Sequence, residues 1–550
     1  MHLHRRLWNP YLLVFLTSGS IMVIELVASR LIAPRVGVSL YTWTSVIGVI
    51  LAGISLGNYL GGRLADRYAS SRLLGIVLGL SALATLAILW LNNDLHAFRL
   101  PLQAPFVVWI VAYIAAVFML PAVMLGCVSP IVVKLSLTSL QRSGSTVGKI
   151  YAWSSVGSIA GTFITGFILI SKLGTKETIT VVAGLLMLLA LWFLTDAPWR
   201  KALLWAGVAF FLFIGALGFL WRGGFFRKEC RLETNYFCIN VYEREMGGRP
   251  IRELILDRLV HSYSDLSDPT NLVYGYEKVY AAVIQPLMLR KPDLDVFFIG
   301  GGGYTFPRYL EATLPESHLV VAEIDPGVTE TAHELLGLSR ETRVVTYNED
   351  ARQTLMLRVQ PASFDVVFGD AFNDYSVPYH LTTLEFDQLV ARALREDGLY
   401  LANIIDGGKR GHFLRAFVHT VRRAMPYVAV IPSMEGWQTS TRNTFVIVGS
   451  RQPLDLSYLP AEYQPVPEEE LEAYLALEDP LVLTDDYVPV DNLLAPVVSD
   501  SAAGFVLEGE IAHRVRVRLI AVGAFLLACL IGGIILLVAK RRRRVQSALE

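Results

Sequence analysis

Long apolar segments dominate the first 222 residues of the chain. Runs of about 20 apolar residues, the length that a helix needs to cross a bilayer, occur there near 10–33, 41–62, 73–92, 105–128, 150–171, 177–195 and 202–221. A further run lies near 518–539, whereas 223–510 contains none and carries charged residues at ordinary density. The pattern predicts a seven-span helical domain over 1–222, a soluble domain over 223–510, and a C-terminal span with a basic tail over 511–550.

The composition agrees with a membrane protein. Hydrophobic residues make up 53% of the 550 residues and charged residues only 18%, whereas a typical soluble chain carries about 25% charged residues. The mean hydropathy is +0.46. The formal net charge of −1 gives no general attraction to nucleic acid, so we expect no nucleic-acid partner. The lipid bilayer is the expected partner of the apolar runs, and the composition is also compatible with a homo-oligomer.

Charged residues and prolines interrupt two of the runs. The fourth contains Pro121 and Pro130, so one kinked span and a span followed by a re-entrant piece both fit it. Glu25 and Arg30 interrupt the first run and no small-residue cleavage site follows, so we expect a span there and no cleaved signal peptide. A charge at mid-bilayer costs about 2.5–3.5 kcal/mol. The two residues either line an internal polar cavity, or Arg30 extends to the outer interface while Glu25 pairs with a neighbouring helix.

Basic residues in the short loops predict the orientation, because cytoplasmic loops carry an excess of Lys and Arg. With the N-terminus in the cytoplasm, the inner side receives 15 basic residues and the outer short loops receive four. The inner set is Arg5, Arg6, Arg63, Arg67, Arg72, Lys134, Arg142, Lys149, Arg200, Lys201, Lys540, Arg541, Arg542, Arg543 and Arg544. The outer set is Arg35, Arg99, Lys172 and Lys176. Seven spans precede the soluble domain, which is therefore predicted to lie outside the cytoplasm, with both chain termini inside.

Two cysteines at the start of the soluble domain fit this location. Cys230 and Cys238 enclose the segment CRLETNYFC, and such a pair closes a short loop as a disulfide in an oxidising compartment. The alternative is two free thiols on adjacent strands.

Glycines four or five residues apart recur in two spans. They are Gly53, Gly57 and Gly61 in one, and Gly157, Gly161 and Gly166 in the other. This spacing lets helices approach closely, and tight packing alone explains it. The adjoining segment GGRLADRYASSR also resembles the cytoplasmic loop after the second span of major facilitator transporters. The spans before the soluble domain amount to about half of such a transporter, so transport is not implied.

The soluble domain begins with a pattern of exposed strands. Residues 233–243 and 251–261 alternate polar and apolar positions, and Gly247 and Gly248 between them predict a turn. A helix is expected over 272–290. The start of the domain is thus predicted to be a β-hairpin that precedes an α/β unit.

A Rossmann-like, nucleotide-binding half-unit follows. The buried strand DVFFI leads into Gly300, Gly301 and Gly302, a helix follows, and the next strand ends at Glu323, about 20 residues past the glycines. Glycines let the backbone approach a ligand, and an acid at the end of the second strand accepts hydrogen bonds from ribose hydroxyls. Glycines and an acid at this spacing together indicate a nucleoside site.

Acids end the next two strands as well. RVVTYNEDA reaches Asp350, and SFDVVFGDAFND reaches Asp370. In an open α/β sheet, ligands bind outside the carboxyl ends of the strands. Three acids at successive strand ends, with no zinc-type cluster of His or Cys beside them, point to binding and polarising a cationic or amine substrate. We expect no metal.

The ordered motifs of the soluble domain resemble the spermidine synthase (polyamine aminopropyltransferase) family, and in particular its branch fused to membrane spans. The similarity covers roughly 225–450 and rests on ETNYFCINV, LILDRLVHSYSDLSDPTNLVYGYE, FIGGGG, AEID, EDA and FGDAFNDYSVPYHL. It implies a class I methyltransferase-like α/β domain. It also implies that an aminopropyl group is transferred from decarboxylated S-adenosylmethionine, as co-substrate, to an amine.

The resemblance also implies roles for individual residues. The ribose-binding acid of the family falls on Glu323, and the pair at the adenine falls on Asp350 and Ala351. The catalytic acid falls on Asp370, as general base, and a proline that contacts the nucleoside matches Pro378. Tyr276 and Asp374 are the positions expected to bind the amine.

Several positions depart from the family pattern on the amine side. Gly303 stands where soluble members carry an acid, Phe237 replaces a glutamine, and a Tyr-His-Glu reads Gly275-Tyr276-Glu277. Asp370 and Asp374 are also one residue further apart than the usual pair. The later segment LTDDYVPVDN, with Asp485 and Asp486, either supplies missing carboxylates or caps a turn near the membrane.

Three functions are compatible with these observations. The first is a membrane-bound aminopropyltransferase of polyamine biosynthesis. The second is a transporter or sensor whose diverged soluble domain binds a polyamine or nucleoside. The third is a different S-adenosylmethionine-dependent transfer on the same scaffold.

Overall fold

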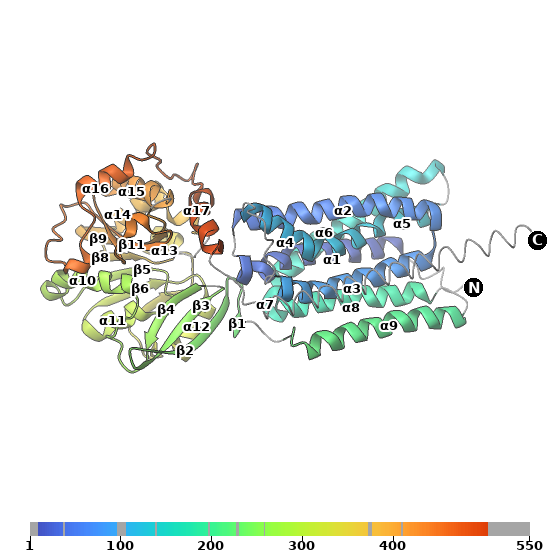
Figure 1. The fold of residues 1–550 in the computed structure, drawn as a ribbon, viewed down its shortest axis with the longest axis horizontal. Helices are drawn as coiled ribbons and strands as arrows, with labels where there is room; N and C mark the ends of the chain where they lie inside the picture. The colour runs from blue at the N-terminus through green and yellow to red at the C-terminus, as the bar shows by residue number, and fades with distance from the viewer. Residues whose placement is uncertain are drawn as a thin grey trace, which may run out of the picture.

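The computed structural model describes residues 9–36, 39–95, 106–137, 140–195, 199–226, 230–257, 259–371, 377–408 and 411–503. The predicted span near 518–539 and the predicted amine-binding residue Asp374 lie outside these residues. The described chain forms a helical bundle and a soluble α/β domain at one end of it (Figure 1).

The bundle consists of nearly parallel helices, most of them long (Figure 1). They are α1 (Pro10–Val36), α2 (Leu40–Tyr68), α3 (Ser71–Leu95), α4 (Phe106–Gly126), α5 (Val128–Ser136), α6 (Ser143–Ile164), α7 (Ile170–Leu173), α8 (Thr175–Leu194) and α9 (Trp199–Arg222). A π-helical turn over Thr165–Leu169 joins α6 to α7. By length and composition, seven helical segments of the described chain are long and apolar enough to cross a membrane. The fourth predicted span is one helix interrupted at Cys127, between α4 and α5.

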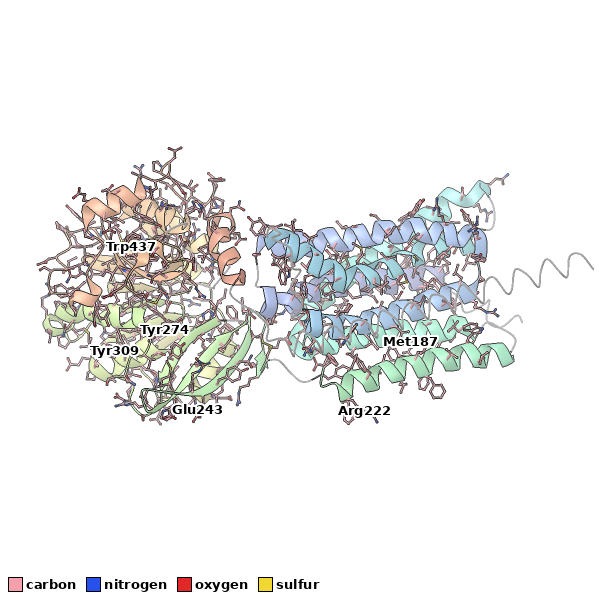
Figure 2. The ribbon with its side chains drawn as sticks, in the orientation of Figure 1. Met187, Arg222, Glu243, Tyr274, Tyr309 and Trp437 are labelled. Carbon is pink, nitrogen blue, oxygen red and sulfur yellow. A yellow bond between two sulfur atoms is a disulfide. The ribbon has the colours of Figure 1, made fainter. Side chains whose placement is uncertain are left out.

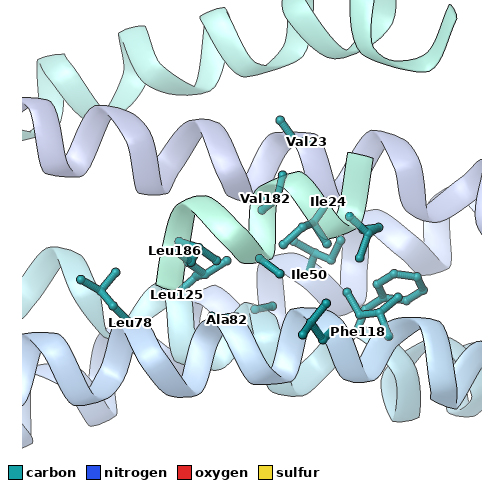
Figure 3. Packing of buried hydrophobic residues seen from close by; sticks show 14 of the residues in the cluster. Val23, Ile24, Ile50, Leu78, Ala82, Phe118, Leu125, Val182 and Leu186 are labelled. Carbon is teal, nitrogen blue, oxygen red and sulfur yellow. The ribbon is translucent and has the colours of Figure 1, made fainter. Parts of the chain in front are cut away.

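Apolar side chains fill the centre of the bundle, and the buried cluster draws them from α1 to α6, α8 and α9. Figure 3 shows Val23 and Ile24 of α1 near Ile50 of α2, together with buried residues of α3, α4 and α8. The labelled residues of those three helices are Leu78, Ala82, Phe118, Leu125, Val182 and Leu186.

The glycine spacings seen in the sequence mark the closest helix contacts. A Cβ on Gly157 of α6 would lie 2.1 Å from the carbonyl oxygen of Phe15, and one on Gly161 would lie 2.5 Å from that of Gly19. Any side chain there would therefore separate α6 from α1. Gly166 differs, because a Cβ on it would meet no described atom within 4 Å.

A second glycine stripe seals α2 against the fourth span. A Cβ on Gly57 would lie 2.3 Å from the carbonyl oxygen of Val123, and one on Gly61 would lie 2.6 Å from the backbone of Cys127. Gly53 faces Ala122 in the same way. Tight packing thus explains five of the six spaced glycines.

The soluble domain opens with a four-stranded antiparallel sheet. Its order is β1 (Leu232–Glu233), β2 (Cys238–Met246), β3 (Arg249–Leu256) and β4 (Leu259–Asp265). The predicted hairpin turn at Gly247 and Gly248 is confirmed. The single strand predicted over 251–261 is wrong, because the chain turns at Asp257 and the last residues of that range begin β4. Asp257 has a φ of +55°, a left-handed conformation that ends β3.

The main sheet has seven strands in the order β10-β11-β9-β8-β5-β6-β7. They are β5 (Asp295–Ile299), β6 (His318–Ala322), β7 (Val345–Tyr347), β8 (Phe364–Gly369), β9 (Leu394–Asp406), β10 (Tyr427–Pro432) and β11 (Asn443–Ser450). Strands β5 to β9 pair in parallel, while β10 and β11 are antiparallel.

Helices cover both faces of this sheet (Figure 1). The helices of this domain are α10 (Gly275–Arg290), α11 (Thr305–Thr313), α12 (Pro326–Leu335), α13 (Ala351–Leu357), α14 (Leu384–Ala393), α15 (Phe413–Ala424), α16 (Glu468–Leu475) and α17 (Val490–Ala503). Because both faces are covered, the central strands are largely apolar, and every residue of β8 is buried, Asp365 included. A rigid parallel sheet of this kind leaves its carboxyl edge as the place where polar side chains can gather.

Candidate active site

The glycine loop leaves β5 at the carboxyl edge of the sheet and turns into α11. Gly300 has a φ of +92° and Gly302 a φ of +49°, which is left-handed backbone that glycine adopts readily. A Cβ on Gly300 would also lie 2.6 Å from the carbonyl oxygen of Asp370. The loop can therefore cross directly over the end of β8 only because glycine stands at this position.

Glu323 follows β6 and holds the loop in place. Its Oε2 accepts hydrogen bonds from the amides of Gly301, at 2.8 Å, and Gly302, at 3.3 Å. Its Oε1 accepts one from the amide of Asp325 at 2.9 Å. Burial raises the pKa of the Glu323 carboxyl, and these amides oppose the rise. The predicted glycines and the predicted ribose acid thus contact one another.

Asp350 lies at the next position along the edge, at the N-terminus of α13. Its Oδ1 accepts a hydrogen bond from the amide of Gln353 at 3.0 Å, and its Oδ2 lies 2.7 Å from His380 Nε2. The hydrogen bond with His380 lowers the pKa of the Asp350 carboxyl. Ala351, the first residue of α13, is buried beside it. Pro378 comes two residues before His380 and begins a 3₁₀ turn.

Asp370 follows β8, beneath the crossing of the glycine loop. Tyr276 Oη donates a hydrogen bond to its Oδ2 at 2.7 Å, and Asn403 Nδ2 donates one to its Oδ1 at 2.9 Å. Desolvation raises the pKa of the Asp370 carboxyl, although both hydrogen bonds oppose this shift. A carboxyl group with a raised pKa at the ligand edge of a sheet is suited to taking up a proton.

Glu277, beside Tyr276 on α10, is a second acid near Asp370 that the sequence did not single out as a site residue. Its side chain is 3% exposed. Among the residues that the structure describes, none hydrogen-bonds its Oε2. Burial raises the pKa of the Glu277 carboxyl well above its usual range, and the nearby charge of Asp370 raises it further. Among the described residues, no basic side chain supplies this acid with a counter-charge.

Tyrosines surround this pair of acids. Tyr274, labelled within the soluble domain in Figure 2, lies 4.9 Å from Tyr276 between ring centroids, and Tyr276 lies 5.4 Å from Tyr280. Burial raises the pKa of the Tyr274 hydroxyl to about 12. The hydroxyls therefore stay neutral and can donate to Asp370 or to a ligand. No periodic pattern distinguishes these rings from ordinary core residues.

The departures noted in the sequence have structural causes. A Cβ on Gly303 would lie 1.9 Å from Ser262 Oγ, so β4 leaves no space for an acid at that position. Phe237 packs against the apolar core instead. Asp485 does not replace the missing acid beside Asp370 and Glu277. Its carboxylate is paired with Arg352 at 2.5 Å and accepts a hydrogen bond from Thr383.

The chain is similar in sequence to several known proteins. No family model matches the chain. It is 29% identical over 161 residues to a polyamine aminopropyltransferase of Chromobacterium violaceum, an alignment that covers 29% of this chain and 60% of that protein. It is 22% identical over 464 residues to polyamine aminopropyltransferase 2 of Ralstonia nicotianae, which covers 78% of this chain and 85% of that one. The second alignment is too long to fall within the soluble domain alone.

A solved structure is also similar. It is a probable spermidine synthase from Corynebacterium glutamicum, at 22% sequence identity and a TM-score of 0.37, covering 50% of this chain and 95% of that one. At this TM-score the structural match adds nothing to the sequence relatives, which support a relationship to the polyamine aminopropyltransferases. The chain spans no more than 60% of the length of the first such relatives.

Proposed function

We propose that this chain is a membrane-bound aminopropyltransferase that transfers an aminopropyl group from decarboxylated S-adenosylmethionine to an amine acceptor. The observation that carries the proposal is the setting of Asp370: a carboxyl group with a raised pKa, held by Tyr276 and Asn403, directly under the glycine loop. The sequence relatives are named polyamine aminopropyltransferases, which supports the same reaction.

In this proposal, Asp370 acts as the general base. An amine with a pKa of about 10 is protonated at neutral pH and has no lone pair with which to attack. Asp370 takes up that proton, and the freed nitrogen forms a bond to the aminopropyl carbon next to the sulfonium. The bond from that carbon to sulfur breaks, and sulfur keeps the electron pair as neutral methylthioadenosine leaves. General base catalysis of this kind is worth typically about 10²–10⁴-fold.

Glu277 gives the acceptor a second carboxylate. A diamine carries two cationic ends, and Asp370 and Glu277 offer two nearby acids in a desolvated site. Charge-assisted hydrogen bonds to an ammonium group would supply the counter-charge that Glu277 lacks. We therefore propose that Glu277 and Tyr276 bind the amine acceptor, in place of the acid that Gly303 excludes.

The nucleoside half fits the co-substrate. We propose that Glu323, which accepts from the glycine loop, also accepts from a ribose hydroxyl, and that Asp350 with Ala351 binds the adenine, as the family resemblance implies. Pro378 and the 3₁₀ turn that follows it stand on the same side as Asp350. The predicted residue Asp374 remains a proposed amine ligand.

We further propose that the spans cross a membrane and that the soluble domain lies on its outer side. Three observations support this. The seven candidate spans have the required length and hydropathy. The soluble domain contacts the helix ends that the count of basic residues assigns to the outer side, through Tyr41 and Thr175. The Cys230–Cys238 disulfide suits an oxidising compartment.

The test is methylthioadenosine formation by the full-length protein in detergent or nanodiscs. The protein is incubated with decarboxylated S-adenosylmethionine and a panel of diamines, and the product is measured by mass spectrometry. We expect release that depends on the amine and is lost in Asp370→Asn. The matched control is Asp387→Asn, which alters a fully buried acid of α14 outside the site. Nucleoside binding without release for every amine would contradict the enzyme and favour the sensor.

A further inference from the structure

We propose that Arg30 and Thr234 are positioning residues: together they connect the outer end of the first membrane helix to the glycine loop and set the orientation of Glu323. The structural part of this inference is independent of the reaction. Its consequence for nucleoside affinity rests on the proposed function.

The first link joins the helical bundle to the start of the soluble domain. The guanidinium of Arg30, on α1, donates hydrogen bonds to the carbonyl oxygens of Thr234 and Asn235. Its Nε lies 4.0 Å from Glu233 Oε1, and that carboxylate also accepts a hydrogen bond from Thr175 Oγ1 at 2.5 Å. The segment 233–235 is therefore held between α1 and α8. Arg30 thus lies at the end of α1 that faces the soluble domain, where it binds protein.

The second link passes through the Thr234 side chain. Its hydroxyl lies 2.5 Å from Asp325 Oδ2 and donates to it. A Cβ on Gly327 would lie 2.3 Å from Thr234 Cγ2, so this approach requires glycine at the start of α12. The other oxygen of Asp325 accepts from the amide of Gly327 at 2.8 Å. The Asp325 side chain is thus fixed both by Thr234 and by its own helix.

The third link reaches the nucleoside site. The amide of Asp325 donates to Glu323 Oε1, while Glu323 Oε2 accepts from the amides of Gly301 and Gly302. The amide of Asp325, at the end of the connection from α1, therefore fixes Oε1 of Glu323, while Oε2 fixes the glycine loop. A change in the Thr234–Asp325 contact alters the position of the carboxylate that is proposed to bind the ribose.

Hydrogen bonds, more than packing, hold the first link. A cavity of about 380 Å³ lies between the two domains, lined among others by Arg30, Glu233 and Asn235. The disulfide between Cys230 and Cys238 restricts the segment from both ends. Because Arg30 and Thr175 hold 233–235 from the bundle side, removing one of these hydrogen bonds should be felt along the whole connection.

The variant that tests the connection is Thr234→Val in the full-length protein, with Thr234→Ser as the rescue because it keeps the hydroxyl. The first readout is hydrogen exchange of the peptide that contains Gly301 and Gly302, without ligand. The second is the Kd for methylthioadenosine. We expect Thr234→Val to speed exchange of this peptide and to raise the Kd about tenfold, the effect of one charged hydrogen bond. Thr234→Ser should restore both.

The bundle end of the connection is tested by Arg30→Gln. It should act in the same direction as Thr234→Val. The matched control is Arg231→Gln, which removes another arginine that lines the same cavity but makes no contact in this connection, and which should leave both readouts unchanged.

The outcomes separate the inference from the proposed function. If a folded Thr234→Val protein exchanges its glycine loop at the wild-type rate, the positioning role is overturned. If exchange speeds up but wild-type protein binds no methylthioadenosine, the connection stands and the proposed function fails. If the valine variant lowers kcat with no change in nucleoside Kd, Thr234 does not act through Glu323 and the inference is wrong.

Discussion

The acids of the proposed nucleoside-binding half and of the proposed amine-binding half of the site have different hydrogen-bond partners. On the nucleoside half, Glu323 accepts from three backbone amides, and Asp350 is paired with an amide and with His380. On the amine half, Asp370 receives only side-chain donors, and Glu277 Oε2 has no partner among the described residues. One half is complete without a ligand, whereas the other is not.

This difference indicates which half of the site requires a cationic ligand to neutralise its acids. A buried carboxyl without a partner costs free energy unless it is protonated or meets a cation. Desolvation raises the pKa of Glu277 and that of Asp370, because burial disfavours their charged forms. A cationic ligand in the amine half would offset this cost of burying the negative charge. The nucleoside half is preorganised by backbone donors and should bind its ligand with little rearrangement.

The largest expected effect is on turnover. Asp370→Asn removes the proposed base and should lower kcat by about 10²–10⁴-fold. The Kd for methylthioadenosine should stay within a few-fold of wild type, because the nucleoside half is complete without Asp370. Steady-state assays of product formation measure kcat, and equilibrium binding measures the Kd. A Kd that rises in parallel with the loss of kcat would contradict the separation of the halves.

Glu323→Gln should produce the reverse pattern. An amide in this position places an NH₂ group against the donating amides of the loop, and hydrogen bonds to a charged group are worth about 1.5–3 kcal/mol. We expect the nucleoside Kd to rise roughly 10–100-fold, with a much smaller change in the KM for the amine. A selective change in the amine KM would place Glu323 in the wrong half.

Glu277→Gln should stabilise the protein while weakening the amine acceptor. The folded-state pKa of Glu277 lies above the unfolded value, so the native state binds its proton more tightly and loses stability as pH rises between the two values. At pH 8 the neutral variant should therefore melt higher, by roughly 2–4 °C if about 1 kcal/mol is relieved. At pH 4 the difference should vanish. A variant that melts lower at pH 8 would show that Glu277 is satisfied in the free protein.

Asp350→Asn should have a smaller effect of opposite sign on stability. The hydrogen bond with His380 lowers the folded-state pKa of Asp350, so its contribution is present above the unfolded pKa and is lost as pH falls through the folded pKa. The variant should melt slightly lower than wild type at pH 7, and the gap should close on acidification. Thermal melts across this pH range provide the measurement. Equal or higher stability of the variant at pH 7 would contradict the pairing.

The carboxyl edge of the sheet could be predicted from the sequence because it follows from local order. A buried strand, a glycine run and an acid after each strand bring Gly300, Glu323 and Asp370 to one edge whenever the strands are parallel. The close helix contacts at the bundle glycines could be predicted from an equally local signal. Their four-residue spacing defines one helix face, and the contact of Gly157 with α1 follows from it.

The rest of the site depends on tertiary contacts that have no local signal. Glu277 is marked in the sequence only as the acid that the Tyr-His-Glu motif retains, and the packing of Tyr280 of α10 against Phe368 of β8 brings it near Asp370. Asn403 lies within β9, and His380 lies beyond the end of β8, far in sequence from Asp350. The contact between Arg30 and Thr234 joins residues more than 200 positions apart. The error at Asp257 arose because a single Asp stands there between two apolar segments with no glycine or proline beside it, although Asp tolerates left-handed backbone.

The most direct measurement is an experimental structure of the full-length protein with methylthioadenosine and a diamine bound together. The account predicts the nucleoside between the glycine loop and Asp350, its ribose on Glu323, and an amine nitrogen within hydrogen-bonding distance of Asp370 with its other end toward Glu277. A diamine bound elsewhere, or the space beside Asp370 filled by protein side chains, would contradict it.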